Sequence, residues 1–336
     1  MCVTASPARL RRGRRIGRNN TTEEELFMEM RKRGHITTDA RGNEVHFNPM
    51  RDVTLVRLFV MPTIILLIVI NIFPLLWSLI LSFSNFSARL PTEWGVNPDM
   101  EGNDNYVALF TDPEVWRKFI VTAQYVVLSV GGEMILGFGF ALLLQTKFAG
   151  RGIIYVLLVL PMTMSPVIVG LMWKLFMDPN WGMFNYILGL GRIDWTQNPD
   201  LNLYAIVFVD IWMWTPFVML LSMAGLSAVP KYLYEAAEVD RASWWFKFTR
   251  ITLPMTYPLL LIALIFRVME AFKIFDLPMG LVGRGAAAPP LLAMEVYNQT
   301  FLTWRTSYGA ALGYIMLIVV VAITSVLVKY LNKAKQ

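Results

Sequence analysis

An acidic side chain and two aromatic side chains share one face of the apolar segment 201–225. Asp210, Trp214 and Phe217 follow one another at spacings of four and three residues, which is the period of an α-helix. A carboxylate accepts hydrogen bonds from hydroxyl groups, and an aromatic ring can cover the apolar face of a pyranose. The pattern is therefore compatible with contact to a sugar, although ordinary packing between helices produces the same spacing and is the simpler interpretation.

A second apolar segment, 256–281, carries charged side chains at every third position. These are Arg267, Glu270, Lys273 and Asp276. Their signs alternate, so neighbours can neutralise each other along one helix, and contact of Glu270 with a solute is the alternative. Glu133 and Lys174 also lie in apolar segments, and we expect each of them to have a partner side chain.

The polar loop 226–255 has the pattern of a helix, a turn and a second helix. Pro230 suits the first turn of a helix, and residues 232–239 favour a short helix after it. Ser243 can cap a second helix, which we expect to end at Pro254.

Glu235 stands beside two small residues, Ala236 and Ala237, in the first of these helices. Alanine lets another backbone approach closely, and the glutamate supplies a directed hydrogen-bond acceptor. The loop therefore has the chemistry of a docking element for a partner protein.

The sequence lacks the residue patterns that several kinds of catalysis require. Both histidines, His35 and His46, precede the apolar segments, and no Cys, His or carboxylate cluster has metal-ligand spacing. No phosphate-binding P-loop occurs, so the chain is not expected to hydrolyse ATP, to hold a cofactor or to be an enzyme.

The elements that position these residues are apolar segments long enough to cross a membrane. The chain has 336 residues, of which 56% are hydrophobic, well above the share in ordinary soluble domains. Six segments have the length and composition of spans: 57–82, 119–144, 153–177, 201–225, 256–281 and 309–330. We predict an all-α membrane protein, and prolines inside several spans (Pro62, Pro74, Pro161, Pro166, Pro216 and Pro278) predict kinks.

The distribution of basic residues predicts the orientation of the spans. Of the 30 Lys and Arg residues, 21 fall on one side, namely in the N-terminal tail through Arg57, in 145–152, in 226–255 and at the C-terminal end from Lys329. Because cytoplasmic loops retain positive charge, both termini are expected in the cytoplasm. The net charge of +6 is concentrated beside spans, where lipid headgroups explain it without a nucleic-acid partner.

The chain divides into a basic cytoplasmic tail, 1–56, and a six-span domain, 57–336. In the tail, Thr22 followed by Glu25 makes a capping box, and a short helix is predicted at about 22–33.

The loop 226–255 resembles the EAA loop of permease subunits of binding-protein-dependent ABC importers. The matching residues are Glu235, Ala236, Ala237, Asp240, Ala242, Phe248, Ile251, Leu253 and Pro254. Weaker matches extend over about 55–330, including Asn105-Tyr106, Leu160-Pro161, Gly182, Asn185 and Phe275-Asp276, and are similar to the carbohydrate-uptake branch with its maltose-type and glycerol-phosphate-type permeases. One position differs, since Arg241 stands where the family pattern has glycine.

The resemblance implies a type I ABC importer permease-like bundle in a bacterial inner membrane. It implies that the loop transmits ATP hydrolysis on a partner, with ATP and Mg²⁺ used there. The implied partners are two copies of an ABC ATPase, a second similar permease subunit, an extracytoplasmic solute-binding protein, membrane lipids and a sugar-like solute. A homodimer of permeases stays open, as do an ion-coupled secondary transporter using Glu133, Asp210 and Glu270 and an intramembrane glycosyltransferase.

Overall fold

The computed structural model describes residues 36–38, 44–46, 49–87, 102–284 and 288–334. The chain separates into two units, residues 1–74 and 75–336, which are considered one at a time. In the first unit, strands β1 (Ile36–Thr38) and β2 (Glu44–His46) form an antiparallel pair that the sequence pattern did not predict. The helix predicted at 22–33 lies outside the described residues.

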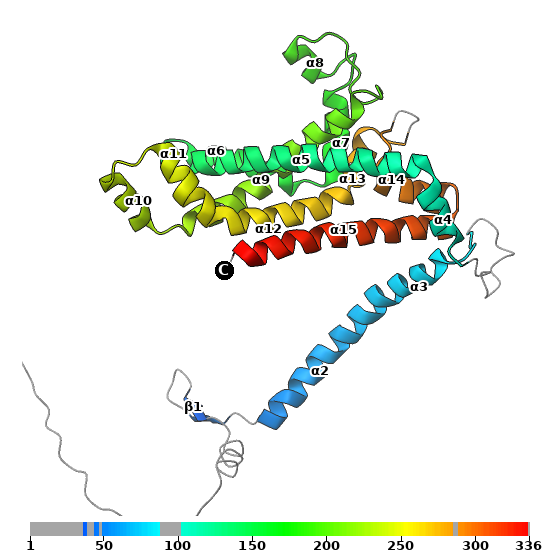
Figure 1. Ribbon diagram of the computed structural model, residues 1–336, viewed down its shortest axis with the longest axis horizontal. Coiled ribbons are helices and arrows are strands. Elements are labelled where there is room, and N and C mark those ends of the chain that lie inside the picture. The colour runs from blue at the N-terminus through cyan, green and yellow to red at the C-terminus, as the bar shows by residue number, and fades with distance from the viewer. Residues whose placement is uncertain (1–35, 39–43, 47–48, 88–101, 285–287, 335–336) are drawn as a thin grey trace, which may run out of the picture. The chain divides into compact units, whose positions relative to one another are not determined.

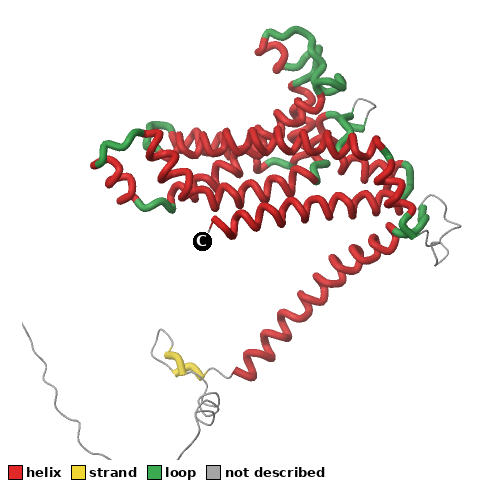
Figure 2. The backbone as a smooth tube through the Cα atoms, viewed as in Figure 1, coloured by secondary structure: helices red, strands yellow, loops and turns green. Residues whose placement is uncertain are grey.

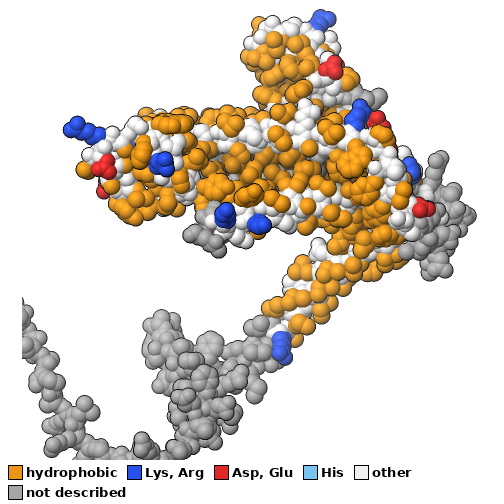
Figure 3. Space-filling view, in the orientation of Figure 1, with side chains coloured by type: hydrophobic (Ala, Val, Ile, Leu, Met, Phe, Trp, Pro, Cys, Tyr) orange, Lys and Arg blue, Asp and Glu red, His pale blue; other side chains and the backbone are white. Residues whose placement is uncertain are grey.

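Five continuous helices have the length and hydropathy of membrane spans among the described residues (Figure 1). Four of them match predicted spans and run over Arg57–Ser82, Pro113–Gln145, Asn202–Ser227 and Thr306–Lys333. The prediction of a helical, multi-span protein is confirmed. On the face drawn in Figure 3, hydrophobic side chains cover the middle of the long helices of the second unit, and charged side chains gather toward the ends.

The first of these helices contains a widened turn. It comprises α2 (Pro49–Leu67), the π-helical turn η1 (Ile68–Ile72) and α3 (Phe73–Ser82). Pro74 follows η1 by two residues, and a proline ring displaces the carbonyl four residues before it. The π-helical turn accommodates this displacement without ending the helix.

The third span is bent, which confirms the kink predicted from Pro161 and Pro166, and the bend divides the predicted helix over 153–177 into two. Helices α6 (Arg151–Val159) and α7 (Pro166–Phe176) are joined by the 3₁₀ turn η3 (Leu160–Thr163) and meet at 105°. Met164 and Ser165 have extended backbones, and for Ser165 the cause is Pro166, since the residue before a proline is disfavoured in helical conformation. Whether the pair counts as one crossing decides between five and six spans.

The fifth span also differs from its prediction at both ends. The helix capped by Ser243 does not stop at Pro254 but continues as α11 (Trp244–Lys247), the π-helical turn η4 (Phe248–Thr252) and α12 (Leu253–Phe272). Pro254 again follows the π-helical turn by two residues, as Pro74 does. At the other end the helix breaks after Phe272, and α13 (Asp276–Leu281) begins separately.

Helices α5 (Pro113–Gln145), α9 (Asn202–Ser227) and α12 form the core of the second unit, and α15 (Thr306–Ala334) lies beside α12 (Figure 2). Helix α9 is the most enclosed of the candidate spans, because 56% of its most apolar stretch is buried inside the protein. Gly137 of α5 permits this packing, since a Cβ there would lie 2.7 Å from Val218 Cβ. Gly137 therefore serves the close approach of α5 and α9.

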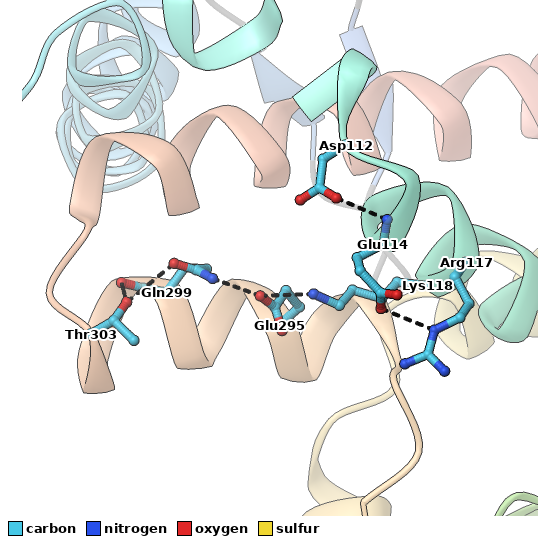
Figure 4. Close-up of polar contacts among 7 residues, drawn as sticks. All are labelled: Asp112, Glu114, Arg117, Lys118, Glu295, Gln299 and Thr303. Carbon is cyan, nitrogen blue, oxygen red and sulfur yellow. Dashed lines mark hydrogen bonds and ion pairs between the residues drawn. The ribbon is translucent and has the colours of Figure 1, made fainter. Parts of the chain in front are cut away.

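Short helices complete the second unit: α4 (Asp104–Thr111), α8 (Met183–Leu188), α10 (Lys231–Val239), α14 (Leu292–Tyr297) and the π-helical turn η5 (Asn298–Leu302). At the end where α5 begins, Lys118 pairs with Glu295 of α14 at 3.0 Å (Figure 4). Gln299 donates to the same Glu295 carboxylate at 2.7 Å, and both members of the ion pair are largely buried. This polar chain fixes the start of α5 against α14 and η5.

Helices α7 and α13 touch through glycine, which gives a testable expectation. A Cβ at Gly170 would lie 2.7 Å from the Leu277 carbonyl oxygen and 2.8 Å from the Leu281 nitrogen. We expect Gly170→Ala to lower the free energy of unfolding in detergent by about 1–3 kcal/mol, because backbone atoms cannot yield easily. Gly139→Ala is the matched control: its Cβ meets nothing within 4 Å, and alanine favours helix, so equal unfolding midpoints for the two variants would contradict the packing argument.

Candidate functional site

The turn between α10 and α11 is closed by a Schellman motif. The Ala242 amide donates to the Ala237 carbonyl at 2.8 Å, and the Arg241 amide donates to the Glu238 carbonyl at 3.0 Å. The Ser243 hydroxyl then accepts from the Phe246 amide at 3.2 Å, which caps the next helix. The helix, turn and second helix predicted for the loop are confirmed, with Ser243 as the cap.

Arg241 occupies the left-handed position of this motif, with φ at 51°. The structure thus has the backbone that the family's glycine would favour, and the arginine accepts the strain. We expect Arg241→Gly to raise the free energy of unfolding by about 0.5–1 kcal/mol, since relief of strain outweighs the added freedom of the unfolded chain. Arg241→Val should lower it, because a β-branched residue is strained further there.

The control for Arg241 is Arg250→Gly, at an exposed position inside η4, where glycine should cost about 1 kcal/mol. Thermal unfolding of the purified variants measures all three changes. A loss of stability in Arg241→Gly as large as in Arg250→Gly would contradict the strain at position 241.

The signature residues of the loop border a shallow groove of about 470 Å³. Those that line it are Ala236, Ala237, Asp240, Ala242 and Ile251, together with Leu233, Ser243 and Phe246. Glu235 is exposed on α10, outside the groove lining, and Phe248, Leu253 and Pro254 belong to the helix that leads into the bundle. The loop therefore exposes an acidic side chain beside a concave surface lined by small and apolar residues.

Two tryptophans in the loop were not singled out by the sequence analysis. Trp244 and Trp245 are 66% and 64% exposed, and Trp244 stacks on Phe248 with ring centroids 5.3 Å apart. Lys247 joins the two helices of the loop by an ion pair with Glu238 at 3.4 Å. The run Trp244-Trp245-Phe246 was the available signal, since exposed aromatic side chains are enriched where proteins meet partners or lipid.

Three buried charged side chains from the three core helices meet inside the bundle. Arg267 of α12 donates from Nε to one oxygen of Glu133 at 2.5 Å and from Nη2 to the other at 2.7 Å. The same Nη2 lies 3.0 Å from Asp210 Oδ2 on α9. All three side chains are at most 3% exposed, so a bidentate pair and a second carboxylate hold the guanidinium out of solvent.

This buried cluster corrects the predicted pairing along the fifth span. Arg267 is neutralised by Glu133 and Asp210 across the helices instead of by Glu270, whereas the expected partner for Glu133 is found. Ser129 Oγ also lies within hydrogen-bonding distance of both carboxylates. Lys174 is exposed on α7, and no ion pair with it occurs among the residues that the structure describes.

The other charges of that span lie at the break between α12 and α13. Glu270 pairs with Lys273 at 2.9 Å, as predicted, although both side chains are about half exposed. Asp276 begins α13 and is exposed. The break places these side chains around a cavity instead of along one continuous helix.

A cleft of about 100 Å³ adjoins the buried cluster. Its charged and aromatic lining consists of Asp210, Trp214, Arg267, Glu270, Lys273, Phe275 and Asp276. The Arg267 guanidinium lies over the Trp214 ring, 4.8 Å from its centroid. The structure thus brings together three of the four predicted path residues, Asp210, Trp214 and Glu270.

Phe217, the fourth, does not line this cleft. Its ring packs edge-on against those of Trp214 and Phe266, at 6.4 Å in each case. Phe217 therefore packs against Trp214 outside the cleft. Within the described ranges, no group of His, Cys, Asp and Glu side chains has the arrangement to hold a metal ion.

Two asparagines among the weaker family matches hold loops in place. The Asn105 amide donates to the carbonyl oxygens of Ser82 and Ser84 at 3.1 and 2.8 Å. Asn185, which is buried, donates to the Ile193 carbonyl and accepts from Trp195 Nε1, both at 2.7 Å. These positions serve the fold of the connecting segments.

Residues 133–336 match the family described as binding-protein-dependent transport system inner membrane component. The trehalose/maltose transport system permease protein MalF of Thermococcus litoralis is 32% identical over 83% of this chain and 94% of its own length. The sulfoquinovosyl glycerol transport system permease protein SmoG of Agrobacterium fabrum is also 32% identical, over 84% of this chain and 91% of its own.

A solved structure of a bacterial ABC transporter for import of the acidic polysaccharide alginate has the same fold. Its matching chain superposes with a TM-score of 0.73 at 21% identity, covering 85% of this chain and 98% of that chain. The chain described here belongs to the family of binding-protein-dependent transport system inner membrane components. The resemblance to ABC importer permeases is therefore confirmed, and the chain is a multi-pass membrane subunit of a transporter rather than an enzyme.

Proposed function

We propose that this chain forms half of the path by which a sugar or related polyol or glycoside enters the cell. The observation that carries the proposal is the loop 226–255, in which the Schellman turn exposes Glu235 beside the groove of small residues. The trehalose/maltose permease is similar to this chain in sequence and the alginate transporter is similar in fold. Both support a saccharide as the solute. ATP would be hydrolysed on a separate subunit, coupled to this chain through the loop.

The proposed partners follow from that role. They are two copies of an ABC ATPase, a second similar permease subunit and an extracytoplasmic solute-binding protein. The small residues Ala236 and Ala237 allow a partner's backbone to approach, and the Glu235 carboxylate can accept hydrogen bonds from its edge. Each of the two permease subunits would engage one ATPase.

The proposed topology has six crossings of a bacterial inner membrane with both termini in the cytoplasm. The bent pair α6 and α7 counts as the third crossing. The excess of Lys and Arg before Arg57, in the loop 226–255 and after the last span supports this orientation. Residues 1–56 then form a cytoplasmic tail, and 57–336 form the permease domain.

The proposed solute path passes the cleft beside α12. Asp210, Trp214 and Glu270 line it, and Phe217 supports Trp214 from behind. A carboxylate and an indole ring at one cleft can bind the hydroxyl groups and the apolar face of a sugar ring. Arg267 holds Asp210 in place for this contact.

Co-purification of the tagged chain from its native host tests the coupling role. We expect an ATPase to accompany the intact chain and to be lost when Ala237 is replaced by proline, which breaks α10. Lys231→Pro is the matched control, because it lies in the first position of α10, where proline is tolerated. A chain that purifies alone and transports in both forms would refute the proposal in favour of a secondary transporter.

A further inference from the structure

The cleft beside α12 has more carboxylates than cations. Glu270, Asp276 and Asp210 line it, with Arg267 and Lys273 as the two basic side chains. Glu133 lies directly behind Arg267. Four carboxylates therefore surround two cations, and the formal charge of the group is −2.

Neither cation is free to receive an anionic solute. Arg267 donates from Nε and Nη2 to Glu133 and Asp210, and its guanidinium plane lies over the Trp214 ring. Lys273 is paired with Glu270 at 2.9 Å. A phosphate, sulfonate or carboxylate entering the cleft would therefore compete with a carboxylate already paired with each cation, most strongly at the buried Arg267.

Asp276 is the carboxylate without a counter-charge. It is exposed at the break between α12 and α13, and no ion pair or hydrogen bond to its side chain is found in the described parts of the chain. Glu270 is 60% exposed despite its pairing with Lys273. Both carboxylates can act on a solute in the cleft, where a partly enclosed site screens charges less than bulk water does.

We propose that this cleft excludes anionic solutes and admits uncharged or amino-substituted saccharides. The inference rests on the proposed function only in taking the cleft as part of the solute path. One similar protein is named for the neutral disaccharides trehalose and maltose, and another for the acidic polysaccharide alginate. Similarity to these proteins therefore does not fix the charge of the solute. For this chain, the arrangement of Arg267, Lys273 and Asp276 favours a solute without negative charge.

Thiol reaction rates measure the charge selectivity of the cleft without knowledge of the solute. In a Cys2→Ser background, Ile274→Cys places a thiol in the cleft lining, and Tyr186→Cys places a reference thiol at an 88% exposed position of α8. The detergent-solubilised complex is treated with a cationic trimethylammonium methanethiosulfonate and with an anionic sulfonate reagent of similar size. The ratio of the two rates cancels changes in the reactivity of the thiol itself.

We expect the ratio of cationic to anionic rate to be at least about tenfold higher at position 274 than at position 186. Adding Asp276→Asn should lower the ratio at 274 by about fivefold. Glu114→Gln, an exposed carboxylate outside the cleft, is the matched control and should leave the ratio unchanged.

Equal ratios at the two thiols, or a ratio that does not respond to Asp276→Asn, would overturn the proposal. The result is independent of whether an ATPase binds the loop 226–255, because the reagents report only on the cleft. Failure of the co-purification would thus refute the coupling role without affecting the charge selectivity. Equal thiol rate ratios with a successful co-purification would refute the charge selectivity alone.

Discussion

Replacing Glu235 with lysine is expected to leave the chain inserted in the membrane while uptake is uncoupled from ATP hydrolysis. The side chain is exposed on α10, so the change does not disturb the core of the bundle. A reversed charge loses the hydrogen bonds that a carboxylate accepts and is repelled by the same partner groups, a cost of about 2–5 kcal/mol in a docked interface. Solute uptake into membrane vesicles should fall by about 30-fold or more.

The matching control for Glu235→Lys is Glu114→Lys, which makes the same change at an exposed glutamate far along the chain from the loop. Glu114 forms only an exposed pair with Arg117, so its loss should change little. ATP hydrolysis is measured beside uptake in the same vesicles. Normal uptake by Glu235→Lys would sink the docking role of the loop.

Replacing Arg267 with methionine is expected to be the most destabilising single change in the bundle. Glu133 and Asp210 would be left buried with no counter-charge, which costs about 3–5 kcal/mol. The yield of folded protein and its unfolding temperature in detergent should both fall. Arg267→Lys should recover only part of the loss, because one ammonium group cannot reproduce the bidentate contact with Glu133.

A neutral version of the cluster separates lost charge pairing from lost packing. Glu133→Gln, Asp210→Asn and Arg267→Met combined should be markedly more stable than Arg267→Met alone, since no charge is left unpaired. Arg117→Met, which removes an exposed pair with Glu114, should cost no more than about 1 kcal/mol. If the triple variant were no more stable than Arg267→Met, the cluster would owe its importance to shape rather than charge.

The local patterns in the sequence predicted much of this molecule. Long apolar segments predicted four of the spans, with three of them within three residues at each end and the second beginning six residues early, at Pro113. The helix, turn and helix of the loop 226–255 were also predictable, since Ser243 caps the second helix through its immediate neighbours. Both kinds of signal are local in the chain.

The partner of Arg267 could not be found in this way. Spacing within 256–281 favoured Glu270, three residues away, whereas the structure pairs Arg267 with Glu133 and Asp210, which are 134 and 57 residues away in the chain. A buried guanidinium is stabilised best where it is fully desolvated and bidentately bound, and that site forms only when three helices pack together. The sequence shows the charges but not which helices adjoin.

The prolines predicted kinks inside the spans, but the sequence did not show which kinks become breaks, for a related reason. The segment 153–177 reads as one span, yet α6 and α7 meet at 105°, and the segment 256–281 is interrupted after Phe272. Hydropathy does not distinguish a proline inside a continuous helix, such as Pro216 in α9, from prolines at a sharp bend, such as Pro161 and Pro166. The neighbouring helices decide which backbone groups find new partners.

The unbroken helix from Trp244 to Phe272 has a mechanical consequence. It runs 29 residues from the loop 226–255 to the edge of the cleft, with Arg267 near its far end. At a rise of 1.5 Å per residue, about 35 Å separates Trp244 from Arg267 along the axis. A tilt of about 5° at the loop end would move the far end of such a rod by about 3 Å, comparable to the length of a hydrogen bond. The helix thus links the surface loop to the buried cluster as one continuous element, so a change of tilt at one end is a displacement at the other.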